Sequence, residues 1–201
     1  MPNTEGKVFW GIRKAYYAIA TIASDGSATY GLPKAVPGAK SLTMDAKGNS
    51  GFFYADDIEY YDLESNEGYE GNLELARILD LVKTDLLGYV EDANGVLYEN
   101  KNADPVHFAL LYESQTDQQP TRYVYYNLTA SKPGKNHKTK EENIEPGTET
   151  IPVKAKPIYI PSLDIWTPSS HSTKDTDAEV FDDWFETVYL PQAAQSGGGG
   201  Q

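Results

Sequence analysis

The stretch Ala15–Leu32, AYYAIATIASDGSATYGL, decides the fold class. On both sides of Asp25-Gly26, aromatic and aliphatic residues mix with β-branched residues, as is typical of β-strands. An Asp-Gly pair between two such runs favours a hairpin with a two-residue type I′ turn. We therefore predict strands over Ala15–Ser24 and Ser27–Leu32, and a fold that is mainly β.

The same turn signal recurs at Asn94-Gly95. It predicts a second hairpin, with strands over Tyr89–Ala93 and Val96–Glu99. A further pair of strands is expected over His107–Glu113 and Arg122–Ala130, and their apolar residues on both faces indicate burial on both sides.

Two segments change to helical spacing. In the first, Asp80 is placed to cap the start and Gly88 to end the helix in the left-handed conformation; its apolar stripe is Leu79, Val82, Leu86 and Val90. In the second, Ala178–Val188, one face gathers Val180, Phe181, Trp184, Phe185 and Val188. This short amphipathic helix needs an apolar surface to cover, either its own chain's or a partner's.

The remaining segments are expected to be loops, links and one edge strand. We predict one domain over residues 1–191 with long loops at about 31–57 and 131–149, followed by a flexible glycine-rich tail at 192–201. Phe52–Asp62 reads as one strand with a solvent-facing side, after which Glu67–Asn72 reads as a link. Pro152 and Pro157 favour an edge position for the strand around Val153, and Ser169–Asp177 is typical of a polar linker.

Charge is unevenly distributed along the 201 residues, whose net charge is −13. Residues 45–99 contain fourteen acidic and three basic residues, a net charge of −11. Such a chain repels nucleic acid, so specific binding of DNA is not expected. The start, MPNTEGKVFWGIRK, is unlike a signal peptide, and no stretch has the length and hydropathy of a membrane span, which predicts synthesis in the cytoplasm and no membrane segment.

Catalytic and cofactor patterns are not found. The chain has no cysteine, and its histidines His107, His137 and His171 lack the spacing of a metal site. Neighbouring acids such as Asp56-Asp57 suggest a glycosidase, but adjacent residues of a strand point to opposite faces, which does not suit two carboxylates sharing one substrate. We therefore expect no enzyme and no cofactor. One function class that stays open is a β-sandwich binding or decoration module, which would recognise carbohydrate through its aromatic residues.

The order of segments resembles the major tail protein (tail tube) family of long-tailed phages. The resemblance covers roughly Lys7–Pro191 and rests on RKAYYAIAT, TYGLPKAVPGAKSLTMD, FFYADDIEYYD, DLVKTDLLGYVEDANGVLYE, RYVYYNLTASKP and VFDDWFETVYLP. It implies a β-barrel or sandwich with a flanking α-helix and a short C-terminal helix. It also implies a virion protein that forms stacked, hexameric rings, and so a conduit for DNA ejection into the host.

The resemblance also implies partners: other copies of the chain, and tape measure, tail terminator and distal tail proteins. From the charge of the middle region, we expect Asp56, Asp57 and Glu59 to face the lumen and keep DNA phosphates from binding. A core-poor segment and the C-terminal helix supply the expected subunit contacts, which are Lys132, Lys135, Lys138, Lys140, Trp184 and Phe185.

Overall fold

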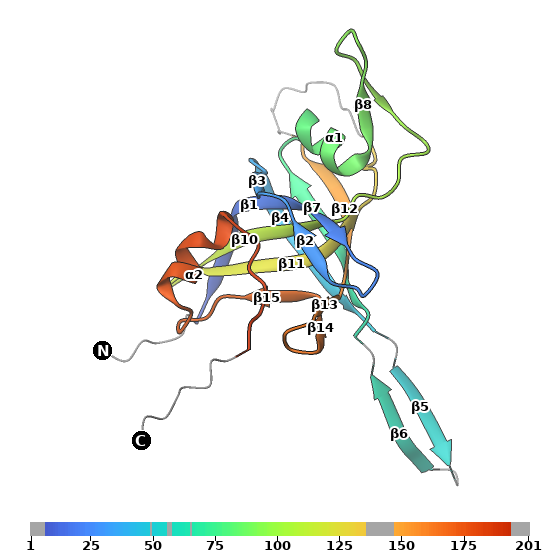
Figure 1. Ribbon diagram of the computed structural model, residues 1–201, viewed down its shortest axis with the longest axis vertical. Helices are drawn as coiled ribbons and strands as arrows, with labels where there is room; N and C mark the ends of the chain where they lie inside the picture. Colours follow the sequence, from blue (N-terminus) through green and yellow to red (C-terminus); the bar gives the residue numbers. More distant parts are fainter. Residues whose placement is uncertain (1–6, 49, 56–57, 65, 136–146, 194–201) are drawn as a thin grey trace.

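The computed structural model describes residues 7–48, 50–55, 58–64, 66–135 and 147–193. In these residues the chain is mainly antiparallel β, which confirms the predicted class, and one sheet of nine strands forms the body (Figure 1). The strands of this sheet are β1 (Phe9–Ile22), β2 (Ala28–Tyr30), β3 (Lys34–Ala35), β4 (Ala39–Lys47), β7 (Gly68–Leu75), β10 (Phe108–Thr116), β11 (Thr121–Ala130), β12 (Glu149–Lys156) and β15 (Ser169–His171).

The main sheet curls until its two ends approach each other. Its strand order is β2-β1-β10-β11-β12-β7-β4, with β3 paired to β1 and β15 to β11. Although β1 and β4 lie near opposite ends of this order, Phe9 and Ile12 of β1 line the same groove as Lys40 and Leu42 of β4. A strongly twisted sheet commonly closes up in this way, and the result is a barrel-like sandwich with apolar residues inside.

The inner face of the curled sheet forms the first core cluster. Alternate residues of its strands point inward, as Leu73 and Leu75 of β7 and Ile151 and Val153 of β12 do. The helix α1 (Asp80–Leu87) adds buried Val82, Leu86 and Leu87 to this cluster. Two residues of the predicted apolar stripe thus pack on the sheet, whereas Leu79 and Val90 are 39% and 38% exposed.

The outer face of β1, β10 and β11 forms the second core cluster. Ala18, Ala109, Leu111, Val124 and Tyr126 point to this side. They are covered by the small hairpin β13 (Ile158–Ile160) and β14 (Ile165–Thr167) and by the C-terminal helix α2 (Ala178–Asp182), which continues as the 3-10 helix η1 (Asp183–Phe185). Because both faces are covered, the prediction that β10 and β11 are buried on both sides is confirmed.

Both predicted hairpins are present, but their turns differ from the prediction. The second hairpin pairs β8 (Tyr89–Glu91) with β9 (Leu97–Glu99). In each turn only the glycine has a positive φ, +86° at Gly26 and +79° at Gly95, whereas a type I′ turn needs two such residues. The glycine N–H donates to the residue three positions earlier, Ala23 or Asp92, so each loop is a three-residue turn that ends in a left-handed glycine.

The ends of helix α1 follow the prediction only in part. Gly88 does take the left-handed conformation, with φ of 68°, and its N–H donates to the Lys83 carbonyl. The predicted cap at Asp80 is wrong: Leu79 occupies that position, and the Asp80 carboxylate instead accepts from Lys83 at 2.8 Å. A carboxylate in the first turn still interacts favourably with the helix dipole.

The predicted long loop at 31–57 is wrong, because it contains three strands. Of these, β4 pairs along β7, and β5 (Ser50–Ala55) pairs with β6 (Ile58–Glu64). The chain therefore reverses within Phe52–Asp62, where one strand was expected, and the expected link Glu67–Asn72 belongs mostly to β7. Exposed strands with polar residues on one side look like loops when only their composition is considered.

The edge position predicted for the strand around Val153 is also wrong. This strand, β12, lies between β11 and β7. Pro152 lies just beyond the last paired residues of β11 and β12, and its carbonyl accepts from the Ser131 N–H. Pro152 is tolerated here because β11 has already ended at this level, so the missing N–H of the proline removes no hydrogen bond between the two strands. The polar linker Ser169–Asp177 begins with a strand, β15.

The predicted loop at 131–149 is described only at its ends. Ser131 to Lys135 and residues 147–148 have no regular structure, and β12 already begins at Glu149. Residues 136–146 and residues 194–201 of the predicted tail lie outside the described residues.

Candidate assembly surfaces

The most prominent surface feature is the hairpin β5–β6, which we call the arm. It extends away from the body beyond the ends of β4 and β7 (Figure 1). Its two strands pair with each other and form a separate two-stranded sheet. A two-stranded hairpin is at best marginally stable in water by itself. Like the β8–β9 and β13–β14 hairpins, the arm has no strand pairing with the main sheet.

Of the three predicted lumen acids, Glu59 alone falls in the described part of the arm. Glu59 lies in β6, opposite Tyr54 of β5. Asp56 and Asp57 lie outside the described residues. The assignment of these acids to a lumen stays a prediction.

Two of the four predicted lysine contacts, Lys132 and Lys135, lie against the β8–β9 hairpin. The Lys135 ammonium lies 3.2 Å from the Glu99 carboxylate and that of Lys132 lies 3.6 Å from it, both within one chain. The Tyr89 hydroxyl donates to the same carboxylate at 2.8 Å and, with the two lysines, holds the pKa of Glu99 below its ordinary value. Lys138 and Lys140 lie outside the described residues, and a subunit contact through any of the four lysines stays a prediction.

The C-terminal helix packs on its own chain. Trp184 is 2% exposed, and its indole N–H donates to the Tyr123 carbonyl at 3.4 Å. This burial places Trp184 in the second core cluster and argues against its direct contact with another subunit. Phe185 is partly buried, and its ring centroid lies 5.0 Å from that of Tyr16.

A buried ion pair between β10 and β11 lies beneath this helix. The guanidinium of Arg122 lies 3.2 Å from the Glu113 carboxylate and 3.8 Å from the Phe181 ring centroid. Both charged residues are almost completely buried, at 8% and 3% exposure. The Lys14 ammonium reaches the same carboxylate from the surface, at 3.4 Å.

Among the described side chains, large apolar residues are exposed in four places. Besides Leu32 and the α1 and β8–β9 region, they occur at the start of β1 and on the β13–β14 hairpin. Phe9 is 80% exposed, Trp10 51% and Trp166 61%. Exposed aromatic residues are common at contacts between proteins. Of the three tryptophans, Trp184 therefore lies in the core, whereas Trp10 and Trp166 lie on the surface.

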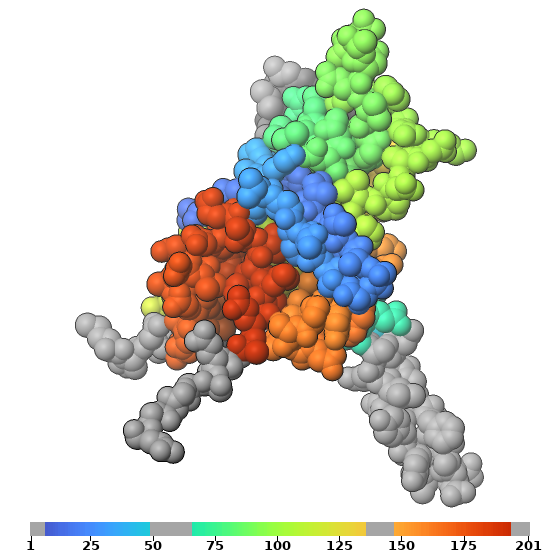
Figure 2. Space-filling view, in the orientation of Figure 1, coloured from blue at the N-terminus to red at the C-terminus, as the bar shows by residue number. Residues whose placement is uncertain are grey.

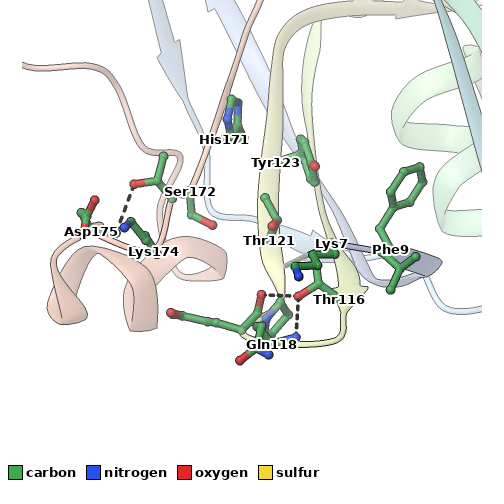
Figure 3. Close-up of a pocket in the computed structure, with 14 residues that line it drawn as sticks. Lys7, Phe9, Thr116, Gln118, Thr121, Tyr123, His171, Ser172, Lys174 and Asp175 are labelled. Carbon is green, nitrogen blue, oxygen red and sulfur yellow. Dashed lines mark hydrogen bonds between the residues drawn. The ribbon is translucent and has the colours of Figure 1, made fainter. Parts of the chain in front are cut away.

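A groove of about 450 Å³ lies beside the start of β1 (Figure 3). Three segments line it: the start of β1, the connection between β10 and β11, and the loop that leads from β15 to α2. Phe9, Tyr123 and His171 supply rings to it, and Lys7 and Lys174 supply charge. The sequence did not predict this groove, since the three segments that line it are far apart along the chain and carry no recognisable motif.

The described residues give no sign of a metal centre or a membrane-spanning helix. No group of three or more His, Cys, Asp or Glu in that part of the chain is arranged to hold a metal ion. No helix there reaches the length and hydropathy that a bilayer-spanning helix needs.

These features define a β-rich protein with separate two-stranded hairpins and exposed aromatic side chains on its surface. Comparison with family models agrees: residues 3–194 match the model of the phage tail tube protein family. Because the match covers nearly the whole chain, this protein belongs to that family, as the resemblance in its sequence indicated. It is thus a structural component of a phage tail. A search of curated proteins gave no match.

Proposed function

We propose that this protein forms rings of six copies, and that these rings stack into the tail tube through which DNA is ejected into the host. In this proposal the chain is synthesised in the bacterial cytoplasm, acts only in the assembled tail, and catalyses no reaction. Tape measure, tail terminator and distal tail proteins set the length of the tube and close its ends. DNA passes through without specific binding, in keeping with a net charge of −13.

The observation that carries the proposal is the arm. Its sequence holds five aromatic residues, which are Phe52, Phe53, Tyr54, Tyr60 and Tyr61. A hairpin of this composition, extending from the body with only its two strands paired, gains stability when another surface covers it. In a tube built from identical subunits, a neighbouring copy is always available to do so.

Electron microscopy tests this proposal. Negative staining of the concentrated protein should show rings or hollow tubes. A variant in which a short Gly-Ser linker replaces residues 50–64 keeps β4 and β7, and is expected to remain monomeric at the same concentration. Tubes formed equally well by the shortened chain would show that assembly does not depend on the arm.

The lysine-rich segment offers a second, independent contact. Since Lys132 and Lys135 already meet Glu99 of their own chain, Lys138 and Lys140 are the better candidates for reaching an acidic neighbour. Replacing all four lysines with Gln should weaken assembly at low salt, where charge interactions are least screened. Unchanged assembly at low salt would remove this segment from the interface.

A further inference from the structure

The lining of the groove beside the start of β1 contains more lysines than carboxylates. Its walls hold Lys7 and Lys174, both exposed, against a single carboxylate in the lining, that of Asp175. The Asp117 carboxylate lies nearby and accepts the backbone N–H of Lys7 at 2.9 Å. Among the described residues, neither lysine ammonium has an ion-pair partner. The groove therefore offers two free cations beside exposed aromatic rings.

The arm has the complementary composition. Its two strands contain Glu59, Asp62 and Glu64 and no lysine or arginine, together with the five aromatic residues named above. An acidic and aromatic hairpin suits a groove that presents two lysines without ion-pair partners beside aromatic rings, because charge complementarity orients the contact and the rings supply apolar area.

The arm and the groove lie on different sides of one subunit. The arm leaves the body on one side (Figure 1), whereas α2, which lies next to the groove, is on the other side of the body (Figures 1 and 2). An arm placed in this way cannot turn back into the groove of its own chain. Contact between two different surfaces of identical subunits is heterologous, and heterologous contacts produce closed rings or continuing stacks.

We propose that the groove lined by Lys7, Phe9, Tyr123, His171 and Lys174 is the docking site for the β5–β6 arm of a second copy of this chain. This inference rests on the proposed function, and it names the surface that receives the arm. It also competes with the lumen prediction, because acids held in a subunit contact do not line the channel.

Charge reversal tests the contact. One variant combines Lys7→Glu with Lys174→Glu, and a second combines Glu59→Lys with Asp62→Lys. A third carries all four substitutions, which exchanges the two charges. Lys101→Glu with Lys156→Glu is the matched control, since it reverses two exposed lysines outside the groove. Circular dichroism checks that each variant folds, and the concentration at which tubes appear is the measured quantity.

We expect each reversal alone to raise that concentration at least about tenfold, and the combined variant to recover most of the loss. The control should assemble like the original chain. A groove variant that assembles like the control overturns the proposal, and so does a combined variant with no recovery, because the arm is then not the occupant. An unaltered chain that forms no rings or tubes contradicts the proposed function and this contact together.

Neutralising Asp56, Asp57 and Glu59 with Asn, Asn and Gln separates docking from the lumen prediction. Docking of the arm predicts impaired tube formation. The lumen assignment predicts intact tubes with slower DNA ejection, and that result would overturn the docking site.

Discussion

The indole of Trp166 lies against Gly26, in the turn between β1 and β2, so closely that a Cβ on Gly26 would be 2.3 Å from Cη2 of the indole. Gly26 also has φ of +86°, a conformation that other residues adopt at a cost. Two independent constraints therefore require glycine here. The contact also holds β13–β14 against the first hairpin, where the Gly26 carbonyl accepts the Tyr159 N–H at 2.9 Å.

Gly26→Ala should consequently destabilise the protein more than Gly95→Ala. Both changes cost about 1–2 kcal/mol from positive φ. Gly26→Ala adds about 1–3 kcal/mol of steric conflict with Trp166, whereas the nearest atom at Gly95 is a Glu91 carboxylate oxygen at 3.6 Å. Urea unfolding measures both values. Adding Trp166→Ala should remove the excess at Gly26 only, and equal losses for the two glycines would contradict the contact.

The buried ion pair between Arg122 and Glu113 predicts a second difference in stability between two variants. Arg122→Met leaves Glu113 buried with only the partly exposed Lys14 as a partner, so we expect a loss of about 3–5 kcal/mol in the free energy of unfolding. Lys14→Met, which removes the surface member of the same cluster, should cost about 0–1 kcal/mol. Chemical denaturation distinguishes these values. Similar losses for both variants would mean that burial of the Arg122 pair is unimportant.

The burial of Trp184 predicts that the C-terminal helix stabilises its own subunit. Because its side chain is 2% exposed in its own subunit, Trp184→Ala should destabilise the isolated subunit by about 3–5 kcal/mol. Trp10→Ala, at a side chain that is 51% exposed, should change stability by less than about 0.5 kcal/mol. If Trp184→Ala instead left the subunit stable and impaired only assembly, Trp184 would be a subunit contact after all.

The lowered pKa of Glu74 predicts part of the dependence of the protein's stability on pH. Hydrogen bonds from Thr148, Lys40 and Ser41 lower the pKa of Glu74 from 4.5 to about 2. A carboxyl whose pKa is lower in the folded state stabilises the fold above its ordinary pKa, and loses this effect as the pH falls through the folded value.

The melting temperature of Glu74→Gln should therefore be lower than that of the original chain at pH 7, and this difference should disappear between about pH 4.5 and pH 2. Glu91→Gln, at an exposed residue of β8, serves as the control and should follow the original chain at every pH. A constant difference between Glu74→Gln and the original chain would show that its ionisation is not involved.

The sequence by itself determined the local structure. Alternating residues around Asp25-Gly26 and Asn94-Gly95 predicted two hairpins, and helical spacing with Gly88 predicted α1. The apolar residues of β10 and β11 predicted burial on both faces. Such features follow from residues close together in the chain, whose periodicity records which side faces the core.

Only the tertiary structure decided which strands are neighbours and which surfaces remain uncovered. It placed β12 inside the sheet in spite of Pro152, turned a predicted loop into β4 and the arm, and buried Trp184 against its own sheet. It also brought Lys7 and Lys174 to one groove. The physical reason is that pairing and docking depend on partners far along the chain, and a segment's own composition does not identify them.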